Sequence, residues 1–161
     1  KNGINKITSI ETDLNWVNKL LKNETISSKI KNKELNLIHH DINCIWWEHI
    51  SWNKKPKEMK QTMKSSWKRY SDLVNDLDYI PDLILNDGRF RVASLLKLYE
   101  KIDKDTVILF HDYKDRHQYH VVEKFFNKIE ECDTLFVFKK RDNIDYESLK
   151  LLIEKYEYNI D

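Results

Sequence analysis

Short apolar runs rich in β-branched residues alternate with stretches of helical periodicity along the whole of this sequence. Each run is shorter than an ordinary helix and is followed by polar residues, which is typical of a buried strand. Five such runs are present: Lys6–Ile10, Leu35–Ile38, Asp82–Leu85, Thr106–Phe110 and Thr134–Phe138. Strands that alternate with helices and are apolar on both faces favour a parallel sheet covered on both sides. The sequence therefore predicts an α/β fold, namely a Rossmann-like three-layer α/β/α arrangement with a mostly parallel sheet.

The stretches between these runs carry apolar residues at steps of three and four, which places those residues on one face of a helix. Asp13 precedes the first stretch and is suited to cap its helix. Further helices are predicted over residues 92–99, 121–129 and 149–156. The longest stripe ends before Pro81 and comprises Met59, Met63, Trp67, Tyr70, Val74 and Leu77. Because Trp67 and Tyr70 belong to this stripe, we expect them in the core.

Charge and apolar run length exclude several classes of protein. Lys and Arg number 28 against 27 Asp and Glu, so the net charge of +1 gives no reason to expect a nucleic acid as partner. No apolar run approaches the ~20 residues of a membrane span, and no charged-then-apolar signal segment opens the chain, so no membrane partner is expected. A chain of 161 residues is long enough for one domain with a real core.

Two further features bear on compartment and origin. The two cysteines, Cys44 and Cys132, show neither a CxxC spacing nor a disulfide framework, so a reducing compartment such as the cytoplasm is expected. A single alanine, Ala93, is unusual because alanine is the best helix former. Its scarcity indicates an AT-rich genome, and a parasite, an AT-rich bacterium and a large DNA virus all remain open as the source.

Candidate chemistry is expected at the carboxyl ends of the strands, where ligands bind in open parallel sheets. Two successive runs end in NDGRFR and HDYKDRHQYH, so Asp87 and Asp112 are expected to converge from neighbouring strands with histidine and arginine beside them. For Asp13 and for the lysines after the fifth run, a capping or solvated role is preferred. Asp87 and Asp112 are therefore the leading pair.

These strand ends also carry a family resemblance. The string PDLILNDGRFR (residues 81–91), followed by VILFHDY (107–113) and YHVVEKFF (119–126), resembles the C-terminal two thirds of a class I S-adenosylmethionine-dependent methyltransferase domain. The strand ends SIETD and HHDIN fit the same frame in the same order. In that family a first strand and a glycine-rich loop should precede Lys6, where only Gly3 stands. The resemblance thus implies a single methyltransferase-like domain over 1–161 that is N-terminally incomplete.

The resemblance implies a role for each matching residue in binding the cofactor and a metal. Glu11 would bind the ribose hydroxyls of S-adenosylmethionine, Asp41 and Ile42 would flank its adenine, and Asp87 would also face the cofactor. Asp87 and Asp112 lie where metal-dependent O-methyltransferases place two carboxylate ligands for Mg²⁺. Such an ion would hold vicinal hydroxyls of an acceptor and lower the pKa of the attacking one.

The resemblance further implies that the chemical step is an in-line methyl transfer to a hydroxyl, for which the protein supplies orientation and a base. His111 and His120 are the candidate bases, the first because it adjoins Asp112 and the second because it lies in YHVVE. Arg89 would hold either an acceptor phosphate or the Asp87 carboxylate. Asp87, His111, His120 and Arg89 are thus the predicted catalytic residues.

Residues 44–80 form an aromatic-rich insertion in this frame, with Trp46, Trp47 and Trp52 in its first part. Aromatic faces suit sugar rings and other planar acceptors, so a small hydroxylated molecule such as a sugar is the expected acceptor. Exposed aromatic residues in the insertion would also allow a homodimer contact.

Two alternatives stand beside the O-methyltransferase. Loss of the glycine-rich loop would leave a binding or scaffold module of a larger protein, with the fold but without catalysis. Use of Asp87 and Asp112 as metal ligands would also suit a phosphoryl or glycosyl transferase.

Overall fold

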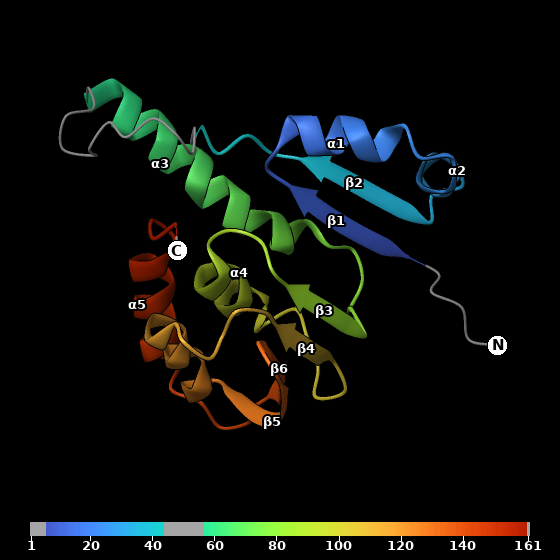
Figure 1. The fold of residues 1–161 in the computed structure, drawn as a ribbon. Coiled ribbons are helices and arrows are strands. Elements are labelled where there is room, and N and C mark those ends of the chain that lie inside the picture. The colour runs from blue at the N-terminus through green and yellow to red at the C-terminus, as the bar shows by residue number, and fades with distance from the viewer. Residues whose placement is uncertain (1–5, 44–56, 161) are drawn as a thin grey trace. The chain divides into compact units, whose positions relative to one another are not determined.

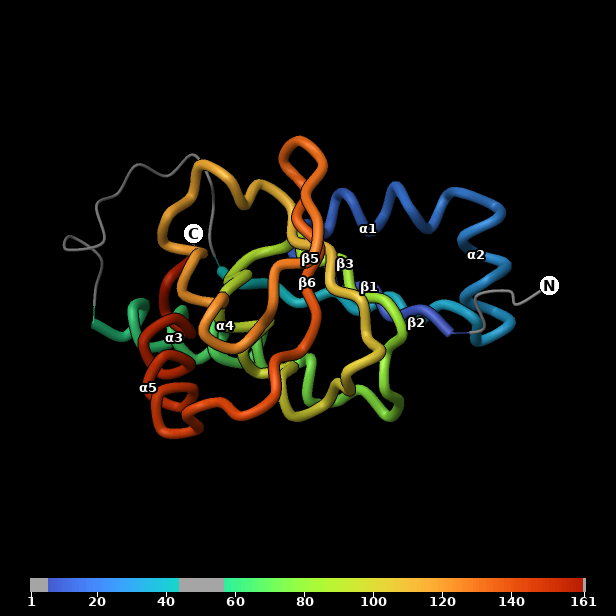
Figure 2. The backbone as a smooth tube through the Cα atoms, turned by 90° about the horizontal axis from the view of Figure 1, so that it is seen from below, coloured from blue at the N-terminus to red at the C-terminus, as the bar shows by residue number. Residues whose placement is uncertain are grey.

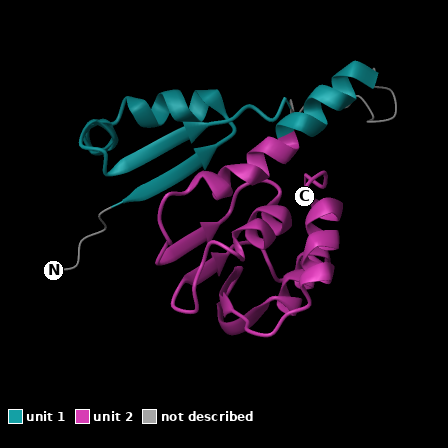
Figure 3. Cartoon of the chain, turned by 180° about the vertical axis from the view of Figure 1, so that it is seen from behind, with its two compact units in different colours: residues 1–66 teal, residues 67–161 magenta. Residues whose placement is uncertain are grey.

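The computed structural model describes residues 6–43 and 57–160, and the chain divides into two compact units, residues 1–66 and 67–161 (Figure 3). Each unit contains its own sheet, and Figure 1 labels the elements. The prediction of one domain over 1–161 stays a prediction, as does the insertion at 44–80. The tryptophans 46, 47 and 52 lie outside the described residues.

The first unit contains two parallel strands joined through helices. Strand β1 (Ile7–Glu11) leads into α1 (Leu14–Leu21) and α2 (Glu24–Lys31), and β2 (Leu35–His39) pairs with β1 in parallel. The Asp13 carboxylate accepts hydrogen bonds from the backbone N–H groups of Asn15 and Trp16, which confirms that Asp13 caps α1. Both predicted strands of this unit are confirmed.

The predicted apolar stripe forms a helix. Helix α3 (Lys57–Asp72) continues into a 3₁₀ turn, η2 (Leu73–Asp76). Met63, Trp67, Tyr70 and Val74 are buried as expected, whereas Met59 is 47% exposed in the first turn. Leu77 lies just beyond η2 in extended backbone and is half-buried, so the stripe is confirmed for its middle part and not for its two ends.

The second unit contains a four-stranded sheet in the order β3-β4-β6-β5. Strands β3 (Leu83–Asn86) and β4 (Val107–Phe110) are parallel. Strand β6 (Leu135–Lys140) runs antiparallel to both β4 and β5 (Phe126–Cys132). This sheet is mixed, so the expectation of a mostly parallel sheet is not confirmed.

The helix predicted over residues 121–129 is wrong. The first half of this range belongs to a 3₁₀ segment, η3 (His117–Lys124). Strand β5 begins at Phe126 and forms a hairpin with β6, which can be traced in Figure 2. The pairing of Lys128 with Phe138 holds the second half in a strand. A helical pattern of apolar residues carries no information about a pairing partner ten residues further along the chain. Here the pairing of the two strands outweighs the local helical preference.

The two faces of this sheet differ. Ile108, Phe110 and Phe138 are fully buried on one face, in a unit that contains α4 (Arg91–Leu98), α5 (Tyr146–Tyr156) and the C-terminal end of α3. On the other face Leu83 and Leu85 of the edge strand β3 are 57% and 64% exposed. A second covering layer is thus not seen over β3 among the described residues, and the three-layer arrangement stays a prediction.

A buried charge ties three helices together in the second unit. The Lys97 ammonium on α4 contacts Asp72 Oδ1 at 2.6 Å, Glu157 Oε2 at 3.1 Å and Ser71 Oγ at 2.8 Å. The Lys97 and Glu157 side chains are 5% and 8% exposed. Lys68 lies at the rim, 2.9 Å from Asp72. We call Lys97, Asp72, Glu157 and Ser71 the Lys97 network.

None of the helices in residues 6–43 and 57–160 combines the length and the apolar content that crossing a membrane requires.

Candidate functional site

The register of β3 and β4 brings Asp87 and His111 together. Asn86 pairs with Phe110 at the carboxyl end of the two parallel strands, so the next residue of each strand leaves the sheet at the same point. The backbone N–H of His111 donates to the carbonyl of Asn86 at 3.2 Å, which extends the ladder by one bond. The convergence expected from the sequence is therefore observed, and its cause is the strand register.

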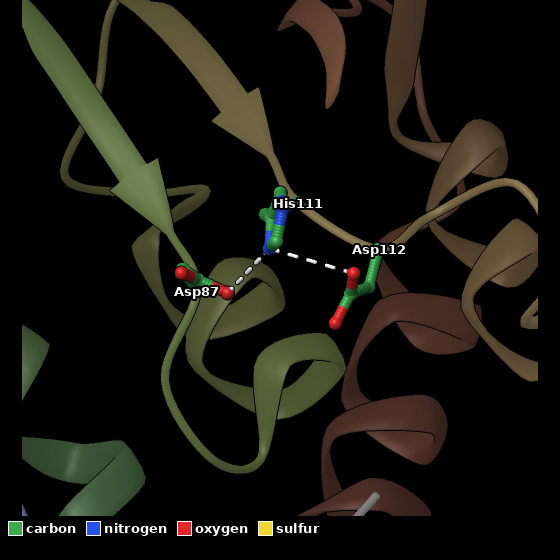
Figure 4. A group of neighbouring side chains, drawn as sticks. All are labelled: Asp87, His111 and Asp112. Atoms are coloured by element: carbon green, nitrogen blue, oxygen red, sulfur yellow. Dashed lines mark hydrogen bonds and ion pairs between the residues drawn. The ribbon is translucent and has the colours of Figure 1, made fainter. Parts of the chain in front are cut away.

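Asp87, His111 and Asp112 form a compact group (Figure 4). His111 Nδ1 lies 2.8 Å from Asp87 Oδ1 and 3.6 Å from Asp112 Oδ1. Since a carboxylate oxygen only accepts, the Nδ1 position carries the proton in the shorter contact and Nε2 has the lone pair when the ring is neutral. The side chains of Asp87, His111 and Asp112 are 45%, 38% and 36% exposed, so the group is open to solvent.

Asp112 adopts a left-handed backbone conformation, with φ at 55°. This conformation is costly for most residues with a side chain, and aspartate is among those that tolerate it. The turn lies immediately after His111 and precedes Tyr113, whose ring is 1% exposed and packs against Phe110. A buried residue on each side of the turn thus fixes the backbone that carries His111 and Asp112.

Arg91 supplies the positive charge of the group. Its guanidinium lies 3.1 Å from Asp87 Oδ1 and 3.4 Å from Asp112 Oδ2, although its side chain is only 7% exposed. Arg116 adds a second guanidinium, 3.4 Å from Asp112 Oδ2, and donates to the Tyr119 hydroxyl at 2.9 Å. We call Arg91, Asp87, His111 and Asp112 the Arg91 network.

Gly88 is required by packing in the loop after β3. A Cβ atom at this position would lie 2.5 Å from the hydroxyl oxygen of Tyr70, which is far inside van der Waals contact. That hydroxyl accepts a hydrogen bond from the backbone N–H of Arg89 at 3.3 Å. Tyr70 of α3 therefore holds the loop that carries Asp87, and a Cβ at position 88 would force the Tyr70 ring or the loop to shift.

Arg89 and His120 are the other two predicted catalytic residues. The ion pair of Asp87 is made with Arg91, four residues along the chain, and the role predicted for Arg89 stays a prediction. His120 lies in η3, stacks on the Tyr113 ring at 4.9 Å, and its buried Nε2 has no hydrogen-bond partner among the described residues. An aromatic packing role accounts for this placement, and the role of His120 as a base stays a prediction.

The predicted cofactor residues of the first unit lie at the ends of its two strands. Glu11 ends β1 opposite His39 of β2, and the Glu11 carbonyl accepts from the backbone N–H of His40 at 2.9 Å. Partial burial raises the pKa of Glu11, against a weak hydrogen bond from Ser9 at 3.5 Å. Asp41 accepts from the backbone N–H of Asn43 at 2.6 Å, and Ile42 is 3% exposed.

The Asp87, His111 and Asp112 ligand atoms lie within 4.8 Å of one another, close enough to hold a metal ion. Two observations weigh against Mg²⁺. Both carboxylates already have guanidinium partners, one of them the nearly buried Arg91. Mg²⁺ also prefers oxygen ligands, whereas the third donor is an imidazole nitrogen. The residues present thus fit Mg²⁺ poorly, and the metal site stays a prediction.

Sequence reasoning placed Arg91 among the ionisable residues after the third run but gave it no role, and it did not single out Arg116 or the hydroxyl of Tyr70. Asp87 and Arg91 are four residues apart, and Asp112 and Arg116 repeat this spacing after the next strand. Because neither pair lies within one helix, and outside a helix a spacing of four does not bring side chains together, the spacing gave no local signal for the two arginines.

The fold has a counterpart among solved structures. No family model matches the sequence, and no curated protein matches it. A methyltransferase-like protein from Silicibacter pomeroyi DSS-3 is similar in structure with a TM-score of 0.67 and 24% sequence identity. The match covers 93% of this chain and 75% of that protein. The chain has a methyltransferase-like fold.

Proposed function

We propose that this chain is an S-adenosylmethionine-dependent O-methyltransferase in which His111, oriented by Asp87, removes the proton of an acceptor hydroxyl. The observation that carries the proposal is the 2.8 Å contact between His111 Nδ1 and Asp87 Oδ1 at the carboxyl ends of two parallel strands. The methyltransferase-like fold supports it. An imidazole whose Nδ1–H is held by a carboxylate presents Nε2 as a base, which is the arrangement that general-base catalysis needs.

S-adenosylmethionine supplies an electrophilic methyl group bound to a sulfonium sulfur. In the proposed step the acceptor oxygen forms a bond to that carbon while the carbon–sulfur bond breaks, and S-adenosylhomocysteine is released. His111 Nε2 takes the hydroxyl proton, and the Asp87 carboxylate stabilises the resulting imidazolium. Glu11, Asp41 and Ile42 are the residues proposed to bind the cofactor, with Asp87 as a further candidate. The proposed acceptor is a small hydroxylated molecule such as a sugar.

The first experiment measures binding of S-adenosylhomocysteine to the 161-residue chain by isothermal titration calorimetry. Binding in the micromolar range is expected, and Glu11→Ala should weaken it. Absence of heat at high micromolar ligand would contradict methyl transfer and favour the binding or scaffold module instead.

The second experiment measures transfer of labelled methyl groups to a panel of sugars and other small polyols. Removal of a general base costs about 10²–10⁴-fold in rate, so His111→Gln should lower turnover by that factor and leave cofactor binding unchanged. His117→Gln is the matched control because His117 is exposed and lies outside the Arg91 network. Full activity of the His111→Gln enzyme would contradict the proposed base.

Metal assistance is a second candidate, favoured by the three ligand atoms within 4.8 Å. An ion at this position has to compete with Arg91 for both carboxylates. Two experiments separate the metal-free from the metal-assisted reaction. One measures binding of Mg²⁺ to the chain by titration with MgCl₂, and the other measures the rate of methyl transfer with and without EDTA. We expect EDTA to leave the rate unchanged, and a rate that falls with EDTA and returns with Mg²⁺ would favour the metal.

A further inference from the structure

Arg91 is fixed at both ends. Its own carbonyl accepts from the Asn86 side-chain amide at 3.0 Å, and its guanidinium Nε donates to the carbonyl of Gly88 at 3.1 Å. It is the first residue of α4 and follows Phe90, which has a left-handed backbone and a fully buried ring. The Phe90 ring packs against Trp67 and Tyr70 at 5.7 and 5.9 Å. The direction of the Arg91 side chain is thus set by the core.

The guanidinium of Arg91 contacts both partners of the His111–Asp87 pair. Nη1 donates to the backbone carbonyl of His111 at 2.9 Å, and Nη2 lies 3.1 Å from Asp87 Oδ1. Asp87 Oδ1 is the same oxygen that accepts from His111 Nδ1 at 2.8 Å. One planar cation therefore holds the carboxylate oxygen and the backbone of the residue whose ring that oxygen orients.

Without this contact, little would hold the Asp87 carboxylate in place. The Asp87 side chain is 45% exposed, and its described partners are Arg91 and His111. A carboxylate released into water no longer favours a proton on Nδ1, and a neutral imidazole then also populates the tautomer with the proton on Nε2. That tautomer has no lone pair on Nε2, the atom from which the proposed base acts.

We infer that Arg91 is a positioning residue that fixes His111 as its Nδ1–H tautomer by anchoring Asp87 Oδ1. The role of this tautomer in catalysis rests on the proposed function. The tautomer itself can be measured in the unliganded chain. The fork geometry of the guanidinium matters here in addition to its charge. A lysine ammonium is a point charge and cannot hold Asp87 and the His111 carbonyl in one plane.

The test uses NMR of the 161-residue chain labelled with ¹⁵N. Long-range ¹H–¹⁵N correlations of the imidazole rings report which nitrogen carries the proton, at about pH 8.5 where an ordinary histidine is neutral. His111→Gln assigns the signals. The wild-type chain should show His111 protonated at Nδ1, and Arg91→Lys and Asp87→Asn should each shift it to a mixture containing the Nε2–H form.

Arg116→Lys is the matched control, because it changes a guanidinium that contacts Asp112 Oδ2 and the Tyr119 hydroxyl and leaves the Arg91–Asp87 pair in place. It should leave the His111 signals unchanged. A folded Arg91→Lys variant that keeps a pure Nδ1–H tautomer overturns the inference, as does a wild-type His111 protonated at Nε2.

A measurement on the wild type alone covers the case in which Arg91→Lys fails to fold. A guanidinium held at Nε, Nη1 and Nη2 rotates slowly about its Cζ–Nε bond, so the Nη protons of Arg91 should give separate signals. A single averaged signal would overturn the inference. Failure of methyl transfer with an intact Nδ1–H tautomer would contradict the proposed function instead, so the two failures are distinguishable.

Discussion

The Lys97 network and the Arg91 network are built alike, but one is closed and the other is open. Each has a nearly buried cation, 5% exposed for Lys97 and 7% for Arg91, that holds two carboxylates. In the Lys97 network the carboxylates are 26% and 8% exposed, whereas in the Arg91 network they are 45% and 36% exposed. The same ion-pair construction thus stabilises helix packing when covered, and presents a histidine to solvent when left open.

The largest expected effect comes from breaking the closed network. Lys97→Met leaves the buried Glu157 with only the more distant cation Lys68, whose Nζ lies 3.6 Å from Glu157 Oε2. Losing one partner of a buried pair costs about 3–5 kcal/mol of unfolding free energy. Urea denaturation followed by circular dichroism measures the loss. Lys150→Met is the control, since Lys150 is 68% exposed on α5 and should change stability by less than about 0.5 kcal/mol.

Adding Glu157→Gln to Lys97→Met sharpens this result. The double variant no longer buries an uncompensated charge, so it should be more stable than Lys97→Met alone. A double variant as unstable as the sum of the two single variants would mean that the residues do not act as a network.

A smaller loss is expected where packing holds the open network. Gly88→Ala forces a Cβ atom against the Tyr70 hydroxyl, and overpacking of this kind costs about 1–3 kcal/mol. Tyr70→Phe removes that hydroxyl, so the double variant should recover part of the loss. If Gly88→Ala lowers the unfolding free energy by the same amount with tyrosine and with phenylalanine at position 70, the contact with the hydroxyl is not the cause.

The strands of the first unit and the β3–β4 pair could be predicted from the sequence, because each is a short apolar run followed by polar residues. The hairpin of β5 and β6 could not. Its turn is Asp133 with φ at 55° followed by Thr134, so it lacks the glycine that marks such turns. Likewise, the convergence of Asp87 and Asp112 follows from strand ends. The pairing of Arg91 with Asp87 follows the left-handed Phe90, which no local pattern indicates.

Acid should weaken the closed network at a predictable pH. Burial alone would raise the pKa of Asp72, but hydrogen bonds from Lys97 and Lys68 outweigh it and lower the pKa below the ordinary 3.8. A depressed folded-state pKa gives stability that is complete above the unfolded value and is lost as the pH falls through the folded one. The difference in unfolding free energy between wild type and Asp72→Asn should therefore be constant above about pH 5 and shrink below about pH 4.

The smallest effect on stability is expected at the open network's histidine. His111 is 38% exposed, so His111→Gln should change the unfolding free energy by less than about 0.5 kcal/mol while removing the proposed base. The denaturation assay used for Lys97→Met measures this. If His111→Gln lowers the unfolding free energy as much as Lys97→Met does, the open network also stabilises the fold, and the proposed difference between the two networks is wrong.

The position of β6 between β4 and β5 also affects how the chain can assemble during synthesis. Strand β4 finds its second neighbour only after β5 and the turn have been made, so the sheet stays incomplete until Lys140 has left the ribosome. Truncated chains ending before Leu135 would expose β4 as a new edge, rich in valine, isoleucine and leucine. Addition of β5 and β6 therefore decides when β4 stops being an exposed edge.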